Sequence, residues 1–248
     1  MIYLKEFSTE NEYLTYRNDK SKYLKPNVSL SDDNGSVYYN YPPKPKPNGH
    51  DYVDLGLPSG TLWATMNVGA SKPSDYGLFF QWGDTDGYTA DQVGRVDGQK
   101  YFGWDDYKWS IDGSDSNFSK YNETDNKTVL ELADDAANAN MGGSWHMPTP
   151  DQIQELMDNT RSGWTTQDGV NGRLFTSKTD TSKSIFIPAA GYAWDGSVIG
   201  RGSSGYVWSS VLSSSGVDVG QYLVFGSGSA YLSNVHRNNG FSVRGVLG

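Results

Sequence analysis

The sequence predicts an α+β fold of antiparallel strands and two short helices, preceded by a small β-rich unit at the N-terminus. In residues 198–248, short apolar runs alternate with Gly, Ser and Asn clusters, which is typical of strands joined by tight turns. The 14% aromatic content, 29 glycines and only 20% charged residues disfavour a helical bundle. Two segments in the middle of the chain have helical spacing and account for the helices.

Residues 1–40 are expected to form a small unit for attachment or oligomerisation. Its expected elements are a strand at 1–7, a short helical piece at 8–18 and strands near 28–30 and 37–39. A unit of this length buries little apolar surface, so it should dock on something else. Residues 41–49 contain alternating prolines, which favour an extended, semi-rigid linker. We therefore place a domain boundary there and assign residues 50–248 to one large domain.

The large domain is expected to alternate strands, loops and two helices. Residues 83–126 lack a sustained period, so they are either a functional loop region or an insertion packed by its own aromatic residues. The first helix is predicted from apolar spacing between 129 and 137 and should end at Gly142. The second begins with Thr149 as N-cap, Pro150 at the first helical position and Gln152 completing a capping box. Strands are expected at 51–55, 61–68, 78–82, 172–176, 184–187, 206–211, 222–225 and 241–246.

The C-terminal strands should separate a structural face from a recognition face. Successive side chains of a strand point to opposite sides, so Leu223 and Phe225 can enter the core while Tyr222 and Val224 face the other way. The second face and the turns at 213–220 and 234–240 mix Tyr, Val, Ser, Asp, Gln, His, Arg and Asn, a composition typical of recognition loops. The alternative is a polar, solvated edge of a β domain.

Composition excludes several classes of function. A net charge of −9 disfavours nucleic acid, because binding to phosphates relies on Lys and Arg. The absence of cysteine removes disulfides, thiolate metal sites, Cys nucleophiles and lipoprotein-type attachment. The first twenty residues are charged and have no long apolar run, so we expect neither a secretory signal nor membrane insertion. No cofactor is expected.

Local motifs carry little catalytic or metal chemistry. Residues 200–205 match G-x-G-x-x-G, but an apolar strand pattern follows instead of a helix, which argues against a dinucleotide site. The three histidines lack metal-ligand spacing, and no G-x-S-x-G elbow is present. Loop aspartates could hold calcium or pair as acid and base, although such residues more often cap turns. These aspartates are Asp84, Asp86, Asp91, Asp105, Asp106, Asp112 and Asp115.

Several motifs occur together and in order between residues 50 and 248. They are VDLGLPSGTLWA (53–64), YGLFFQWG (76–83), GGSWHMPT (142–149), PAAGY (188–192), YVWSS (206–210) and SVR (242–244). Together they resemble the variable proteins of diversity-generating retroelements, which have a C-type-lectin fold and occur in gut bacteria and their phages. Formylglycine-generating enzymes share that fold but depend on cysteines, so the resemblance implies a binding protein, not an enzyme.

The resemblance implies a variable region at about 198–246 in which a fixed framework carries replaceable residues. The implied framework is Gly205, Trp208, Ser209, Ser210, Leu212, Leu223, Phe225, Ser227, Gly228, Gly240, Ser242, Val243 and Arg244. The implied ligand-facing residues are Ser204, Tyr206, Val207, Ser213, Asp218, Val219, Gln221, Val224, Tyr231, Val235, His236, Asn238 and Asn239. The E-P-N, Q-P-D and W-N-D motifs of calcium-dependent lectins are absent, so no calcium-bridged sugar is expected.

Residues 1–40 resemble, more weakly, N-terminal segments of phage tail or virion proteins. The implied function is a phage-tail adhesin that is made in the bacterial cytoplasm, assembles into the virion and binds a host cell-surface protein or glycan. Residues 1–48 would contact other virion proteins, and a homotrimer is expected by analogy alone. The alternatives are a location at the cell surface or outside the cell, an enzyme on the same fold using loop aspartates, and a purely structural virion protein.

Overall fold

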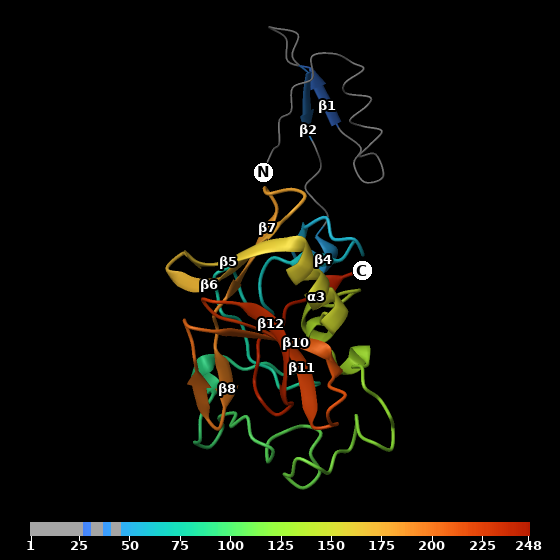
Figure 1. Ribbon diagram of the computed structural model, residues 1–248, viewed down its shortest axis with the longest axis vertical. Coiled ribbons are helices and arrows are strands. Elements are labelled where there is room, and N and C mark those ends of the chain that lie inside the picture. Colours follow the sequence, from blue (N-terminus) through green and yellow to red (C-terminus); the bar gives the residue numbers. More distant parts are fainter. Residues whose placement is uncertain (1–26, 31–36, 41–45) are drawn as a thin grey trace. The chain divides into compact units, whose positions relative to one another are not determined.

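The chain divides into two compact units, Met1–Lys46 and Pro47–Gly248. The computed structural model describes residues 27–30, 37–40 and 46–248 (Figure 1). In the first unit, β1 (Asn27–Leu30) pairs with β2 (Val37–Asn40) in an antiparallel ladder, which confirms the strands predicted near 28–30 and 37–39. The strand predicted at 1–7 and the helical piece predicted at 8–18 lie outside the described residues.

The end of the predicted linker belongs to the larger unit. Pro47–Gly49 forms a short 3-10 turn, η1. The Trp145 indole donates to the Pro47 carbonyl at 3.0 Å, and the Asn48 amide donates to the Met141 carbonyl at 3.2 Å. The large unit therefore begins at Pro47 rather than at residue 50, because these two bonds hold the chain against the segment that follows the first helix.

A central antiparallel sheet contains β10 (Gly205–Leu212), β11 (Val219–Phe225) and β12 (Ala230–His236) in that order (Figure 1). The strands predicted at 206–211 and 222–225 are confirmed, whereas β12 was not predicted. The prediction of one strand at 241–246 is wrong. That segment forms single bridges to Phe80 on one side and to Val207 on the other, and only its end joins a sheet, as β13 (Val246–Leu247). It lies between β10 and residues 79–82 instead of folding back on β12.

Three smaller sheets surround the central one. The first contains β5 (Thr160–Gln167), β6 (Val170–Ser177) and β7 (Ser184–Pro188), which confirms the hairpin predicted at 172–176 and 184–187. The second contains β13, β4 (Leu62–Ala64) and β3 (Tyr52–Asp54), so only part of the strand predicted at 61–68 forms. The third is the hairpin of β8 (Tyr192–Trp194) and β9 (Ser197–Ile199), which the sequence did not predict.

The helices differ in how well local signals predicted them. In α3 (Pro150–Asn159), the Thr149 side chain accepts from the Gln152 amide and the Gln152 side chain accepts from the Thr149 amide, which confirms the capping box. The first predicted helix is shorter than its apolar spacing suggested. A 3-10 turn, η3 (Leu132–Asp134), precedes α2 (Ala136–Met141), and Val129 instead bridges to Val211 of β10. One further 3-10 turn, η2 (Ala90–Gln92), lies in the long loop region.

Two apolar cores cover opposite faces of the central sheet. Leu223 and Phe225 enter a core with Trp63, Phe175 and Ile187. Tyr222 and Val224 enter a second core around Trp82, Trp145, Trp208 and Phe241. The predicted alternation is therefore confirmed, but the expectation of an open second face is corrected: residues 80–82 and 241–243 cover most of it. The α+β class is confirmed, with antiparallel sheets predominating.

Across the described ranges 27–30, 37–40 and 46–248, no helix has both the length and the apolar character needed to span a bilayer.

Candidate ligand-binding surface

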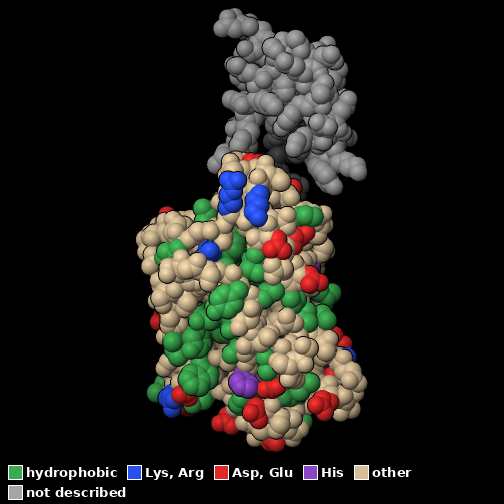
Figure 2. Space-filling model, in the orientation of Figure 1, with side chains coloured by type: hydrophobic (Ala, Val, Ile, Leu, Met, Phe, Trp, Pro, Cys, Tyr) green, Lys and Arg blue, Asp and Glu red, His purple; other side chains and the backbone are tan. Residues whose placement is uncertain are grey.

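An open hollow of about 380 Å³ lies where the β8 strand meets the central sheet. Hydrophobic side chains gather on this face of the molecule (Figure 2). The hollow is lined from four strands and the segment after β12 by Tyr192, Trp194, Tyr206, Tyr222, Val235, His236, Asn239 and Phe241. It is thus a mostly aromatic site with a polar edge.

The floor of the hollow is a ladder of rings that runs outward from the core. Phe241 is buried and stacks on Trp208 with ring centroids 4.3 Å apart. Tyr206 lies over Phe241 at 5.0 Å, and Tyr192 contacts Tyr206 edge to face, also at 5.0 Å. Trp194 is 46% exposed. Because the inner rings are close-packed, the outer rings are held in place without contacts of their own on the solvent side.

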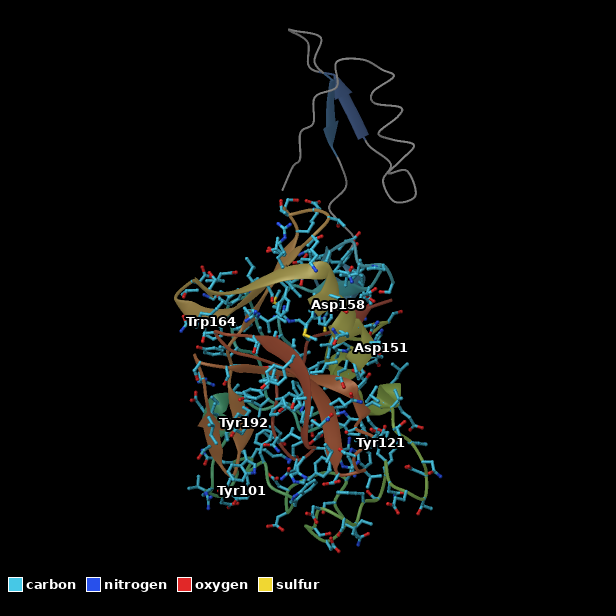
Figure 3. All side chains as sticks on the ribbon, viewed as in Figure 1. Tyr101, Tyr121, Asp151, Asp158, Trp164 and Tyr192 are labelled. Atoms are coloured by element: carbon cyan, nitrogen blue, oxygen red, sulfur yellow. The ribbon has the colours of Figure 1, made fainter. Side chains whose placement is uncertain are left out.

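The β8–β9 hairpin is fixed from both sides, so it forms a rigid wall. Ala193 and Gly240 exchange two backbone hydrogen bonds of 2.8 Å. A side chain at Gly240 would lie 2.3 Å from the Phe102 ring, so only glycine allows this approach. At the hairpin turn, Asp195 accepts from the Arg95 guanidinium and from the Tyr101 hydroxyl. Figure 3 shows Tyr192 and Tyr101 in this part of the molecule.

The polar edge of the hollow depends on the long loop region. His236 Nδ1 lies 3.0 Å from Asp218 Oδ2, and its ring contacts Trp104 edge to face at 5.7 Å. Asn239 Nδ2 donates to the His236 carbonyl at 2.9 Å. Trp104 itself packs on Tyr107 and Phe118. Of the two interpretations for residues 83–126, the structure shows packing by their own aromatic residues, and through Trp104 the region also supports the hollow.

The predicted ligand-facing residues divide into three groups by exposure. Tyr231, at 54%, and His236 are exposed. Ser204, Tyr206, Ser213, Asp218, Val219, Gln221 and Val235 are partly buried. The buried members are Val207, Val224, Asn238 and Asn239.

Three of the four buried members require correction, because the structure buries them and none of them lines the hollow. Val207, at 1% exposure, packs in the core with Leu223 and Phe225, on the opposite face from Tyr206. Asn238 is buried, and its carbonyl accepts from the Gln81 amide at 2.9 Å. Val224 lies between Tyr206 and Tyr231 in the strand register but its side chain belongs to the core around Trp208. None of the three presents a free side chain to a ligand.

The structure brings some of the remaining predicted residues together. Tyr206, Val235, His236 and Asn239 line the hollow, although Asn239 is itself buried. Tyr231 pairs across β11 with the row that contains Tyr206, so it lies on the same face. The others lie farther along. Ser213 follows β10, Val219 and Gln221 are at the start of β11, where Gln221 donates to the Leu212 carbonyl, and Ser204 is in the turn before β10.

Sequence reasoning missed half of the lining. Tyr192 and Trp194 precede the variable region, and Tyr222 and Phe241, which are both buried, were not among the implied ligand-facing residues. A usable signal was present for the first pair. Asp195 and Gly196 both have positive φ, as does the Asp168-Gly169 turn between β5 and β6, and Asp-Gly between alternating residues is the strongest short-range signal of a hairpin.

Burial affects the tyrosine hydroxyls of the hollow. It raises the pKa of Tyr192, with a further contribution from neighbouring Tyr206, and it raises the pKa of Tyr222. Tyrosine hydroxyls are ordinarily protonated at neutral pH, and these shifts act in the same direction, so each hydroxyl can donate one hydrogen bond and accept others.

The loop aspartates mainly bond the backbone of their own turns. Asp106 accepts from the backbone amides of Tyr101, Phe102 and Gly103. Burial raises the pKa of Asp84, which accepts from the Asp86 amide and lies 3.9 Å from Lys100. Within the described part of the chain, no group of three or more His, Cys, Asp or Glu side chains is placed to hold a metal ion. The G-x-G-x-x-G motif leads into β10 rather than a helix.

No protein-family model, curated protein or solved structure matches this chain.

Proposed function

We propose that the chain is a ligand-binding adhesin, the receptor-binding protein of a phage tail, with a C-type-lectin fold and a C-terminal surface diversified by a retroelement. The observation that carries the proposal is the open aromatic hollow, which Tyr206 and His236 line, with the exposed Tyr231 in the same strand row as Tyr206. Residues 1–48 would attach the adhesin to other virion proteins, with a homotrimer as the assembly expected by analogy.

The burial of the implied framework supports this division of roles. Trp208, Ser209, Leu223, Val243 and Arg244 are all fully buried. Their side chains hold the strands from within, so replacement of exposed neighbours would leave the packing intact. The two framework residues that are exposed, Ser227 and Gly228, lie in the β11–β12 turn, where backbone conformation rather than packing matters.

A shallow site of this kind is expected to bind weakly as a single copy. Several copies on one particle would raise the effective concentration of each site after the first has bound, so attachment can be firm without high intrinsic affinity. The hollow offers groups for recognition, and the proposal requires no chemical reaction. The loop aspartates Asp106 and Asp112 accept hydrogen bonds from the backbone amides of their own turns.

The binding proposal predicts that single alanine substitutions at Tyr206, Tyr231 or His236 weaken attachment to cells without unfolding the protein. Labelled full-length protein would be measured on a panel of gut bacterial cells by flow cytometry. Tyr206→Ala, Tyr231→Ala and His236→Ala should each weaken attachment about tenfold or more, as expected for anchor residues in an interface. For the exposed Tyr231 and His236, the free energy of unfolding should change by no more than about 0.5 kcal/mol.

Leu132→Ala is a matched control, since Leu132 is a large exposed side chain, at 61%, on η3 and not among the residues of the hollow. It should leave attachment unchanged. Undiminished attachment by a triple alanine variant at Tyr206, Tyr231 and His236 would contradict the adhesin proposal. Enzymatic turnover of a substrate that depends on Asp84 or Asp106 would contradict it as well.

The diversification part of the proposal makes a separate prediction about the gene. The locus should contain a reverse transcriptase and a near-copy of the segment that encodes residues 198–246. Differences between the two copies should fall on template adenines, at codons for exposed positions such as Tyr231 and His236. Codons for Trp208 and Arg244 should be unchanged, because their side chains are fully buried. Sequencing of the locus tests this, and mismatches spread evenly over framework codons would overturn it.

A further inference from the structure

We propose that the hollow binds the ring of a neutral pyranose sugar without a metal ion. This inference rests on the proposed adhesin and names the class of ligand for the same face. The cavity, at about 380 Å³, is near the lower end of the range of about 300 to 1,000 Å³ found for ligand pockets. That size suits one or two sugar rings better than a folded protein segment.

The chemistry of the lining matches a sugar ring. The face of an aromatic ring carries partial negative charge, whereas the C–H groups on one side of a pyranose carry partial positive charge. Trp194, at 46% exposure, together with Tyr192 and Tyr206, offers such ring surface to the solvent side of the hollow. Stacking there would remove apolar area from water while the equatorial hydroxyl groups of the sugar stay free to form hydrogen bonds.

Polar groups for those hydroxyls lie at the edge of the same hollow. The hydroxyl of Tyr192 is protonated at neutral pH, as tyrosine hydroxyls ordinarily are, and burial raises its pKa further. His236 adds an imidazole to the lining, and Asn239, whose amide nitrogen donates to the His236 carbonyl, adds its side-chain carbonyl oxygen. A small number of polar groups around an apolar floor is the usual composition of a small-molecule site.

The charge distribution favours a neutral ligand over a charged one. The lining contains no Lys, Arg, Asp or Glu. Asp218 is close to the hollow but lies against His236, and the Asp195 carboxylate accepts from Arg95 and Tyr101. An anionic sugar would find no cation in the lining and would approach a chain of net charge −9. A quaternary ammonium group is best bound in an enclosing aromatic cage, whereas this hollow is open.

The wall of the hollow precedes the proposed variable region. Tyr192 and Trp194 come before residue 198 and are held by backbone bonds between Ala193 and Gly240. Diversification would therefore keep the rings of Tyr192 and Trp194 and change Tyr206, Val235 or His236 beside them. The ligand class would stay a neutral ring, and the particular sugar would vary.

The test uses full-length protein and the methyl glycosides of glucose, galactose, mannose and N-acetylglucosamine. Saturation-transfer NMR and calorimetric titration, each with and without EDTA, should show millimolar binding of at least one glycoside, unchanged by chelation. Trp194→Ala should weaken that binding about tenfold, the loss typical of one aromatic stacking contact. Trp194→Phe should restore most of it. Leu132→Ala, at an exposed position outside the hollow, is the control and should have no effect.

Several outcomes would overturn the inference. They are the absence of transfer to every glycoside, binding that Trp194→Ala leaves unchanged, binding that EDTA removes, and competition by tetramethylammonium at similar concentrations. Different outcomes of these experiments would contradict the adhesin proposal. If Tyr231→Ala and His236→Ala weaken attachment to cells while Trp194→Ala does not, the adhesin stands and the sugar ligand falls. If glycosides bind but no cell is bound in a Tyr206-dependent way, the sugar site stands and the adhesin falls.

Discussion

Replacing Arg244 with methionine should lower the free energy of unfolding by about 3 kcal/mol, one of the two largest effects expected for a single substitution in this chain. The Arg244 side chain is fully buried. It donates to Asn67 Oδ1 at 2.9 Å, to the Ala64 carbonyl at 3.0 Å and to the Phe186 carbonyl at 3.0 Å. One guanidinium thus joins β4, β7 and the segment after β4.

The size of the loss follows from what methionine leaves behind. Each of the three acceptors would stay buried without a donor, at a cost of about 1 to 3 kcal/mol apiece. Removal of a desolvated charge offsets part of that cost, since burial lowers the pKa of Arg244 to about 9 and so disfavours its cationic form. This gain is smaller than the cost of leaving three buried acceptors unpaired, so the net change in the free energy of unfolding stays unfavourable.

Urea unfolding followed by tryptophan fluorescence measures this effect. Arg161→Met, at an exposed position on β5, serves as the control and should change the free energy of unfolding by less than about 0.5 kcal/mol. Equal losses for the two variants would show that the three bonds of Arg244 contribute nothing beyond its packing.

Replacing Arg237 with methionine should open the long loop region while the central sheet stays folded. The Arg237 guanidinium is buried, lies 3.7 Å from the centroid of the Phe118 ring, and donates to the Tyr121 carbonyl at 2.9 Å. Its loss removes a cation–π contact and leaves the Tyr121 carbonyl without this donor. Chymotrypsin should then cut between residues 104 and 122 about a hundredfold faster, because cleavage follows the population of the locally open form.

Mass spectrometry of early fragments identifies where the cuts occur. Arg201→Met provides the control, since Arg201 is exposed and lies 4.8 Å from the centroid of the Tyr76 ring in a different part of the unit. It should leave the cleavage rate of 104–122 unchanged. Simultaneous cleavage of the β5–β7 sheet would contradict the prediction, because Arg237 would then hold the whole core and not the loop region.

Local signals predicted those elements whose stability depends on neighbours in the chain. The capping box at Thr149 and Gln152 uses atoms only three residues apart, so α3 could be predicted down to its first turn. The alternation of Leu223 and Phe225 with Tyr222 and Val224 is a property of any strand, and the structure keeps it. The Asp-Gly turns at 168–169 and 195–196 were equally local signals that sequence reasoning overlooked.

Distant contacts decided the rest of the candidate site. Nothing near Tyr222 in the chain shows that residues 80–82 and 241–243 cover its face. From the sequence, Asn238 is expected to be a polar loop residue. In the structure it is buried, and the Gln81 side-chain amide donates to its backbone carbonyl. The proposed role of Trp194 depends on the pairing of Ala193 with Gly240, a contact between segments far apart in the sequence.

The amino-acid sequence by itself determined the fold class, the well-capped helix, the pairing of β6 with β7 and the lack of cysteine chemistry, because each follows from composition or short-range geometry. Only the tertiary structure decided which side chains of residues 198–246 reach solvent and which aromatic residues join them. A strand presents two faces with equal regularity, and which of them is covered depends on packing between segments that the order of residues along the chain does not reveal.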